Sequence, residues 1–382
     1  MVNKIQAALR LVSAHNQAYK HWVKQFIELP RLPFQYVIEP TNYCNMKCLK
    51  CPHGHGFDRE KGYMDIDLYK NVLDQIADSA INLYFMFGGE SFLHKQLFEM
   101  IRLAKEKGIP RTFLATNGTL LKEKFDELFA SGLDNLVISF DGDNRETNQK
   151  LQKGGDFDKM LDGTLSLLRQ KQKRRVAKPF ISVKVIISLK EQKSEIRPEF
   201  SKNFDGLPVN RLYTEVLTLQ GKYAKNLLDD ERFDSLLKEV IQKKNKNDYF
   251  PCFNIFHEMV IAWDGTVIGC CRDLEGINVL GNVKEKTLSE IWNGEAFKDL
   301  RNRLIEGKYS GPCSLCSSLW LGRPKYITSA LFEYLTFSKY VIRDNYPNFT
   351  KWLFSNKLIN NCHISKLSNS LVTNVKCLLT RR

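Results

Sequence analysis

The sequence predicts an α/β fold in which a parallel sheet is covered by helices. The first observation is a set of six short β-rich runs within the first 217 residues. The second is that helix-period stretches separate most of these runs, and repeated β–α units of this kind build parallel sheets. Six strands fit an incomplete barrel as well as an open sheet, so periodicity leaves both architectures open. With 382 residues, 43% of them hydrophobic, the chain can bury a substantial core.

The elements follow one another in a regular order. The predicted strands are residues 34–39, 81–87, 111–116, 135–140, 180–188 and 211–217. Helical periodicity appears in residues 65–79, 94–108 and 122–132, and a further helical segment is expected near 228–247. Gly108 and Gly132 close two of these helices, as glycine commonly does at a helix C-terminus.

The pattern changes near residue 248, where we place a domain boundary. Residues 257–271 predict two short strands joined by Asp264-Gly265, a dipeptide suited to a tight hairpin turn. Helices are expected again in residues 287–307. The predicted parts are a basic helical segment (1–33), the β/α body (34–247), a small α+β domain (248–320) and a basic, aromatic-rich, helical C-terminal extension (321–382).

The net charge of +14 is concentrated at the two ends of the chain. Residues 1–35 hold five Lys or Arg and one acid, and residues 325–382 hold nine Lys or Arg and two acids. Such ends favour an anionic substrate, an acidic partner or peripheral contact with a membrane surface. Solvated flanks that aid solubility are the alternative.

The sequence predicts a cytoplasmic protein. It contains no uninterrupted apolar run of about 18 residues, the length that a membrane-spanning helix needs. Arg10 and polar neighbours interrupt the apolar patch near the N-terminus, which argues against a secretion signal. The chain has ten cysteines. In a reducing compartment, we expect them to be metal ligands or free thiols rather than disulfide partners.

Three cysteines stand close together in "IEPTNYCNMKCLKCPHG", residues 38–54; they are Cys44, Cys48 and Cys51. Their spacing also fits one face of a helix, so a buried cysteine stripe is an alternative. Pro40, Pro52 and the asparagines of this run favour irregular backbone instead. The run follows a predicted strand directly, at the carboxyl end of the sheet, where α/β folds place their sites. We therefore expect a metal-binding loop.

Three thiolates fit two kinds of metal site. They can hold three corners of a [4Fe–4S] cluster, whose fourth iron is then open to another ligand. A structural zinc site needs a fourth protein ligand, which His53 or His55 could supply.

The spacing Cys44-x3-Cys48-x2-Cys51 after a first strand resembles the signature of radical S-adenosylmethionine enzymes. The resemblance implies a partial (β/α)6 barrel, and an open iron that chelates the amino and carboxylate groups of S-adenosylmethionine. Reductive cleavage of this cofactor then yields a 5′-deoxyadenosyl radical, which abstracts hydrogen from a substrate. One departure is that Lys50 precedes the third cysteine, where the family often has an aromatic residue.

Polar residues at the ends of the next strands support this resemblance. Gly88, Gly89 and Glu90 are similar to the family's Gly-Gly-Glu motif, which binds the amino group of the cofactor. The resemblance further implies that Asn117 and Ser139 face its ribose or methionine portion. Ordinary turn capping by Asn and Ser is the alternative for these two residues.

A second set of cysteines lies beyond the β/α body. Cys252, Cys270 or Cys271, and the Cys-x2-Cys pair Cys313 and Cys316 could together hold zinc or a fully ligated cluster. The pattern resembles the auxiliary-cluster extension called the SPASM or twitch domain, whose short form holds one [4Fe–4S] cluster. We expect Cys252, Cys270, Cys313 and Cys316 as ligands and Cys271 as the spare, since neighbouring strand residues face opposite sides. Cys362 and Cys377 are interpreted as ordinary thiols.

The resemblance implies a radical S-adenosylmethionine oxidoreductase that oxidises or rearranges a small polar, possibly anionic, substrate. The auxiliary cluster would accept an electron, and a flavodoxin or ferredoxin would donate one to the first cluster. A peptide-modifying maturase is the first alternative. The second is a zinc-knuckle protein that binds nucleic acid through its basic ends, although no nucleic-acid-binding motif occurs.

Overall fold

The computed structural model describes most of the chain up to residue 316. The described residues are 10, 13–14, 17–18, 20–187, 195–216, 251–308, 310–314 and 316. The helix expected near 228–247, the extension 321–382, Cys362 and Cys377 lie outside them. The chain divides after Trp320, so every described residue belongs to the first unit, Met1–Trp320.

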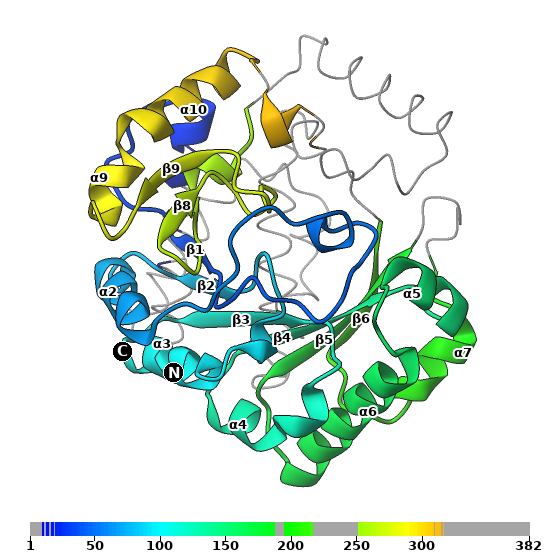
Figure 1. Cartoon of the computed structure of the whole chain (residues 1–382). Coiled ribbons are helices and arrows are strands. Elements are labelled where there is room, and N and C mark those ends of the chain that lie inside the picture. Colours follow the sequence, from blue (N-terminus) through cyan, green and yellow to red (C-terminus); the bar gives the residue numbers. More distant parts are fainter. Residues whose placement is uncertain are drawn as a thin grey trace, which may run out of the picture. The chain divides into compact units, whose positions relative to one another are not determined.

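The described strands form a single sheet in the order β6-β5-β4-β3-β2-β1-β7-β8-β9. Neighbours from β6 through β7 pair in parallel, whereas β8 pairs antiparallel with both β7 and β9. The strands are β1 (Gln35–Ile38), β2 (Asn82–Phe85), β3 (Arg111–Thr116), β4 (Asn135–Asp141), β5 (Phe180–Ile187), β6 (Arg211–Val216), β7 (Glu258–Ile261), β8 (Thr266–Ile268) and β9 (Val279–Asn282). All six strands predicted for the β/α body are confirmed, and the curved parallel sheet is a partial barrel (Figure 1).

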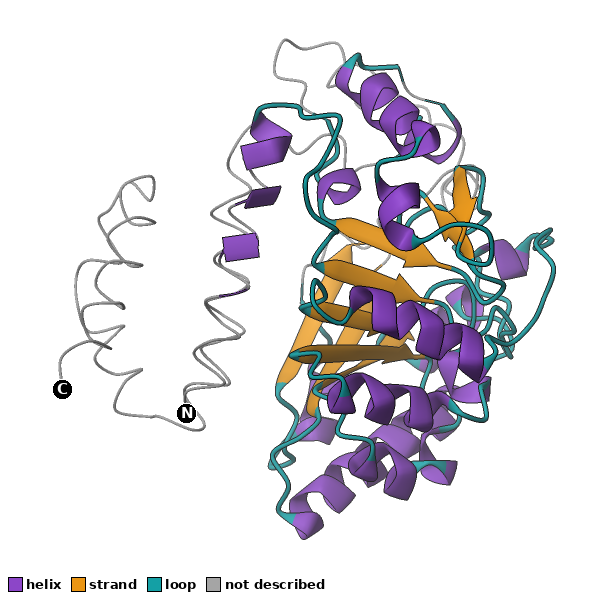
Figure 2. Ribbon diagram, turned by 90° about the vertical axis from the view of Figure 1, so that its left-hand side faces the viewer, coloured by secondary structure: helices purple, strands orange, loops and turns teal. Residues whose placement is uncertain are grey.

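Helices cover the outer face of this sheet, as two views at right angles show (Figures 1 and 2). They are α2 (Ile66–Ile76), α3 (Leu97–Glu106), α4 (Phe125–Ala130), α5 (Arg145–Leu151), α6 (Phe157–Arg174) and α7 (Pro198–Ser201), followed after the hairpin by α9 (Leu288–Trp292) and α10 (Glu295–Ile305). Short 3-10 turns are η1 (Pro52–Gly54), η2 (Ser91–Leu93), η3 (Leu121–Glu123), η4 (Lys202–Phe204), η6 (Asn254–Phe256) and η7 (Gly311–Cys313).

Local sequence explains where the helices begin and end. The Asp65 carboxylate accepts hydrogen bonds from the backbone N–H of Asp67 and Leu68, which satisfies donors that the first turn of α2 leaves unpaired. Gly108 and Gly132 adopt φ values of +80° and +76°, as expected for glycines that close helices. Between these ends, α2 buries Tyr69, Val72, Leu73 and Ile76.

The predicted hairpin is confirmed, and it extends the main sheet. Gly265 turns the chain between β7 and β8 with φ +89°, a conformation that glycine adopts without strain. Strand β7 also pairs in parallel with β1, starting with Gln35 opposite Glu258. The sheet therefore runs without interruption from the β/α body into residues 251–308, while the boundary placed near 248 stays a prediction.

The topology brings four loops to one edge of the sheet. Since β1 to β4 are parallel, their carboxyl ends meet there. The loops after β1, β2 and β3 carry the three cysteines, Gly88 to Glu90 and Asn117, and β4 itself ends at Asp141. In the part of the chain that is described, no helix combines the length and the apolar character needed to span a bilayer.

Candidate active site

The three-cysteine loop is irregular, not helical, between β1 and η1. Backbone hydrogen bonds attach it to the segment after α5, from Lys47 N to Lys153 O (2.7 Å) and from Leu49 N to Leu151 O (2.9 Å). A Cβ on Gly54 would lie 2.5 Å from the Cys48 carbonyl oxygen, so only glycine fits this turn. The helical stripe is therefore wrong, and the loop is held in a fixed shape.

The three thiols lie close enough to influence one another. Burial raises the pKa of Cys44 to about 11, and the neighbouring Glu90 and Cys51 add to this rise. Burial likewise raises the pKa of Cys48 and of Cys51. Iron binding at this loop must therefore displace protons, as is general for thiolate ligands.

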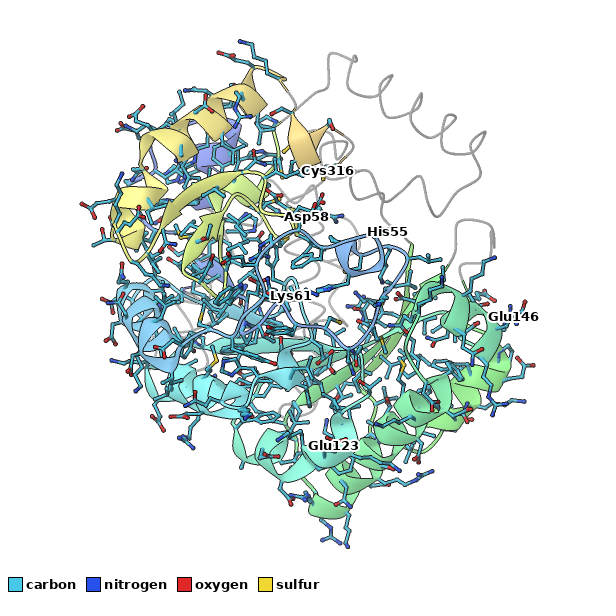
Figure 3. All side chains as sticks on the ribbon, viewed as in Figure 1. His55, Asp58, Lys61, Glu123, Glu146 and Cys316 are labelled. Carbon is cyan, nitrogen blue, oxygen red and sulfur yellow. The ribbon has the colours of Figure 1, made fainter. Side chains whose placement is uncertain are left out.

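The two histidines proposed as zinc ligands each contact a backbone carbonyl through one ring nitrogen. The Nε2 atoms of His53 and His55 lie 2.5 Å from the carbonyl oxygens of Gly88 and Leu49. A carbonyl only accepts, so each Nε2 carries the proton and Nδ1 is the ring nitrogen that a metal would bind. The loop that bears His55, Asp58 and Lys61 crosses the centre of the view, and Glu146 lies at its margin (Figure 3).

Lys50, which stands where the family often has an aromatic residue, forms an ion pair at the site. Its Nζ lies 2.6 Å from Oδ1 of Asp141, a carboxylate that is only 1% exposed at the end of β4. The other oxygen, Oδ2, has no hydrogen-bond partner among the described residues. Lys50 lies between the second and third cysteines in the sequence, and the Asp141 carboxylate balances its positive charge.

Glu90 is buried behind the cysteine loop and accepts several hydrogen bonds. Oε1 accepts from Thr116 Oγ1 (2.8 Å) and Phe92 N (3.1 Å), and Oε2 accepts from Asn117 N (2.7 Å). Burial raises the pKa of Glu90, and these three donors partly oppose the rise. Oε2 accepts one bond of the two that a carboxylate oxygen readily takes, so it retains capacity for an ammonium donor. Its predicted contact with the cofactor stays a prediction.

Protein packing alone already requires glycine at positions 88 and 89. A Cβ would lie 2.4 Å from Glu39 Oε1 at Gly88 and 2.4 Å from the Thr41 carbonyl oxygen at Gly89. Glu90 N also donates to Tyr43 O at 2.9 Å. The Gly-Gly-Glu segment therefore packs directly against the start of the cysteine loop.

Asn117 and Ser139, the two residues predicted to face the cofactor, differ in what the structure shows of their surroundings. Asn117 donates from Nδ2 to Asn45 Oδ1 (2.8 Å) and accepts from Thr119 N (3.0 Å). Asn117 thus bonds to the cysteine loop and also caps its own turn. Ser139 is partly exposed on the same face of β4 as Asp141, opposite the buried Ile138 and Phe140. Their predicted cofactor contacts stay predictions.

The second cysteine set borders one cavity. Its lining includes Cys252, Cys270, Cys313 and Cys316, together with Ile255, Leu300 and Leu304. Burial raises the pKa of Cys252 to about 12 and raises that of Cys270, and the other cavity thiols contribute in both cases. Four thiols around a cavity fit a larger group such as a cluster.

Cys271 faces a different partner from Cys270. Glu258 Oε1 accepts from Cys271 N at 3.0 Å, and proximity to Glu258 also raises the pKa of the Cys271 thiol, after burial. Asn254 Nδ2 donates to the Cys271 sulfur at 3.7 Å. Cys271 is absent from the cavity lining, which supports Cys270 as the ligand. The assignment itself stays a prediction.

Two family matches cover the two cysteine regions separately. Residues 38–183 match the Radical SAM superfamily, and residues 252–317 match SPASM, an iron–sulfur cluster-binding domain. Fold and cysteine sites thus define an iron–sulfur enzyme with two cluster regions. The chain belongs to the radical S-adenosylmethionine superfamily and carries a C-terminal SPASM domain. Its cofactors are S-adenosylmethionine, the radical-SAM [4Fe–4S] cluster and an auxiliary iron–sulfur cluster, and the zinc-knuckle alternative is set aside.

Long similarities extend over both regions. The chain is 28% identical over 316 residues to the tungsten-containing aldehyde ferredoxin oxidoreductase cofactor-modifying protein of Pyrococcus furiosus, covering 73% of this chain and 86% of that protein. It is 24% identical over 286 residues to the S-adenosyl-L-methionine-dependent 2-deoxy-scyllo-inosamine dehydrogenase of Niallia circulans, covering 74% and 90%. The crystal structure of Streptococcus suis SuiB bound to S-adenosylmethionine shares the fold, with a TM-score of 0.55, 18% identity and coverage of 76% and 72%.

Sequence reasoning missed the charged residues around the cysteine loop. Glu39 and Arg59 form a buried ion pair there, and Lys50 pairs with Asp141. A glutamate at the end of an apolar strand is a visible signal for Glu39. Nothing in the spacing of Arg59 indicates its partner, because the two residues meet through an irregular loop.

Proposed function

We propose that this enzyme carries out a net two-electron oxidation of a small polar substrate. The observation that carries the proposal is the cavity bordered by four cysteines. A cluster with four thiolates has no iron left open for S-adenosylmethionine or substrate, so accepting an electron is the chemistry that remains to it. The relative from Niallia circulans, a dehydrogenase similar over 74% of this chain, supports an oxidative outcome.

The chain's own residues support this division of roles. When bound, the first cluster and S-adenosylmethionine supply a radical that abstracts hydrogen from substrate, and the auxiliary cluster supplies the electron acceptor. Cys44, Cys48 and Cys51 would hold the first cluster, while Glu90 and its glycines would orient the amino group of S-adenosylmethionine. Lys50, neutralised by Asp141, adds no net charge beside these thiolates.

The test uses reconstituted enzyme, S-adenosylmethionine, a chemical reductant and a panel of candidate polyols, amino sugars and their phosphates. The expected result is 5′-deoxyadenosine formation that depends on substrate, with a product two hydrogens lighter by mass spectrometry. A product with unchanged mass would instead show a redox-neutral rearrangement and would contradict the oxidation.

A second candidate substrate is a cofactor or cofactor precursor. The similarity to the Pyrococcus furiosus protein, which is named for modifying a cofactor, favours it. Adding organic cofactor precursors to the same assay separates the two candidates, because only the true substrate stimulates 5′-deoxyadenosine formation. Reduction by a flavodoxin or ferredoxin is part of the proposal and is checked by replacing the chemical reductant with such a protein.

A further inference from the structure

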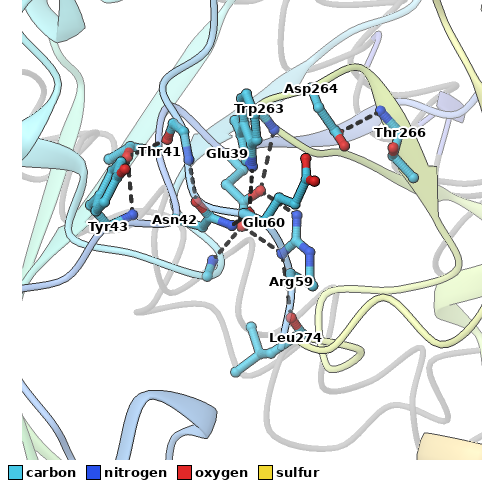
Figure 4. A network of polar contacts seen from close by, with 12 residues as sticks. Glu39, Thr41, Asn42, Tyr43, Arg59, Glu60, Trp263, Asp264, Thr266 and Leu274 are labelled. Atoms are coloured by element: carbon cyan, nitrogen blue, oxygen red, sulfur yellow. Dashed lines mark hydrogen bonds and ion pairs between the residues drawn. The ribbon is translucent and has the colours of Figure 1, made fainter. Parts of the chain in front are cut away.

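A buried ion pair lies between the two cysteine regions. Arg59 contacts Glu39 through two hydrogen bonds, Nη1 to Oε1 at 2.8 Å and Nη2 to Oε2 at 2.6 Å. The Glu39 side chain is fully buried and that of Arg59 is 14% exposed. Two parallel bonds fix the orientation of both planar groups, so the pair is rigid (Figure 4).

On one side, Glu39 contacts the segments that form the candidate cofactor site. Its Oε1 accepts from Gly88 N at 3.0 Å, at the start of the Gly-Gly-Glu segment. Along the chain, Glu39 precedes Cys44 by five residues. A Cβ on Gly88 would lie 2.4 Å from this carboxylate oxygen, so the backbone of Gly88 packs closely on Glu39. Glu39 is therefore one of the contacts that hold the Gly-Gly-Glu segment, together with the bond from Glu90 N to Tyr43 O.

On the other side, the pair contacts the auxiliary region. Glu39 Oε2 accepts from Trp263 N at 3.2 Å, in the hairpin that leads to Cys270. Arg59 Nη1 also donates to Leu274 O at 3.3 Å, four residues after Cys270. The same two side chains thus contact backbone on both sides of Cys270.

A neutral network surrounds the pair and holds Arg59 in place (Figure 4). Asn42 donates to Glu60 O at 2.6 Å and accepts from Gly62 N at 2.9 Å. Trp263 Nε1 donates to Glu60 O at 3.2 Å, and its ring packs on Gly62, where a Cβ would lie 2.3 Å away. These contacts help to attach the loop that carries Arg59 to the start of the cysteine loop and to the hairpin.

We propose that Glu39 and Arg59 form a positioning pair that sets the spacing of the two clusters and the placement of the Gly-Gly-Glu segment. Removing either charge leaves the other buried and uncompensated, which forces the surrounding backbone to rearrange. Gly88, Trp263 and Leu274 then lose the backbone contacts that Glu39 and Arg59 provide. Neither residue touches a reacting atom in this proposal; they act through the loops that they hold.

The test compares three variants with a matched control, all as full chains carrying both clusters. Arg59→Met removes the guanidinium and keeps an apolar stem, Glu39→Gln removes one charge at constant volume, and Arg59→Lys keeps the charge. The control is Arg145→Met, because Arg145 also pairs with a carboxylate, Asp158, whose two oxygens both accept from its Nε, but at an exposed position. Iron content, S-adenosylmethionine affinity and magnetic dipolar coupling between the two reduced clusters are measured.

We expect Arg59→Met and Glu39→Gln to keep wild-type iron and to show altered or broadened dipolar coupling. Their affinity for S-adenosylmethionine should fall about tenfold, the change expected for one lost hydrogen bond to a charged group. Arg59→Lys should recover part of both effects, and Arg145→Met should match wild type.

Wild-type coupling and affinity in both Arg59→Met and Glu39→Gln would overturn the proposal, whatever their melting temperatures, since the pair would then only stabilise the fold. Loss of iron from all three variants would overturn it too, because the pair would then be needed for folding. If Arg59→Met alone loses iron, Glu39→Gln decides. None of these measurements uses a substrate. The result therefore tests the positioning pair independently of the proposed oxidation.

Discussion

The two cysteine regions of this protein are built in opposite ways. The three-cysteine loop places its thiols within eight consecutive residues, after one strand. The auxiliary cavity gathers its thiols from three separate segments, at residues 252, 270 and 313–316. The first region is defined by local spacing, and the second exists only after a hairpin and η7 have come together.

This difference teaches how each region should respond to change. A local loop keeps its cysteines near one another even when its surroundings loosen. An assembled cavity depends on the packing of Ile255, Leu300 and Leu304 around the thiols. The auxiliary region should therefore be the more sensitive to disturbance elsewhere in the fold, and four changes can break or sharpen this contrast.

The largest effect is expected from replacing Cys44, Cys48 and Cys51 together by alanine. Cleavage of S-adenosylmethionine should fall below detection, because no other site has an open iron. Iron should fall from about eight to about four per chain, since the auxiliary ligands remain. Iron analysis and chromatography of 5′-deoxyadenosine measure both. Complete loss of iron would contradict this prediction and would show that the auxiliary cluster cannot be held without the first one.

The second effect separates two adjacent thiols. Cys270→Ala should lower iron to about four per chain, while Cys271→Ala should keep about eight, given one cluster per site. The physical reason is that Cys270 borders the cavity and Cys271 contacts Glu258. Iron content and the spectrum of the reduced auxiliary cluster provide the measurement. The reverse pattern would make Cys271 the ligand.

The third effect concerns the cofactor side of the first region. Glu90→Gln should weaken S-adenosylmethionine binding about tenfold, because an amide cannot pair with an ammonium as a carboxylate does. Titration of the cofactor against the electron paramagnetic resonance signal of the reduced cluster measures this. Unchanged affinity would show that Glu90 only organises the Thr116 and Asn117 turn.

The smallest effect lies at the opposite edge of the sheet, at the start of β4. The Asp134 carboxylate accepts from Lys105 Nζ (2.6 Å), Thr112 N (3.0 Å) and Lys178. Asp134→Asn should lower the free energy of unfolding by about 2 kcal/mol, the loss typical of buried hydrogen bonds to a charged group. Affinity for S-adenosylmethionine should not change, and a change above about threefold would contradict the separation of the two edges.

This last effect should also depend on pH in one direction. Burial alone would raise the pKa of Asp134, but Lys105 and Lys178 overcome it and hold the pKa below its ordinary value of 3.8. The ionised carboxylate thus stabilises the fold above pH 3.8, and this stabilisation is lost as pH falls through the lower folded-state pKa. Denaturant unfolding at pH 7 and pH 3 should show a smaller difference between wild type and variant at the lower pH.

Much of the fold was predictable because its signals are local. Each of the six parallel strands is a short β-rich run, and Gly108 and Gly132 mark helix ends by their own conformational freedom. The hairpin was predictable from Asp264-Gly265 for the same reason. The pairing of β7 with β1 was not, because the residues of β1 do not specify which strand lies at their other side.

The candidate sites likewise contain features with a local sequence signal and contacts that have none. The three-cysteine loop and the Gly-Gly-Glu segment have fixed spacings that can be recognised in the sequence. Alternation favoured Cys270 over Cys271 as a ligand, and the cavity lining, which includes Cys270, supports that prediction without testing the ligation itself. The Glu39–Arg59 pair joins residues 20 positions apart through an irregular loop, and no periodicity encodes such a contact.

The parallel pairing of β7 with β1 has a consequence for any shortened form of this enzyme. A fragment that ends before residue 251 would leave one side of β1 with bare amide and carbonyl groups. Such an exposed border invites strands of other molecules to add to it, which leads to aggregation. The SPASM segment thus covers this side of β1, and the barrel and the SPASM segment are expected to be difficult to express separately.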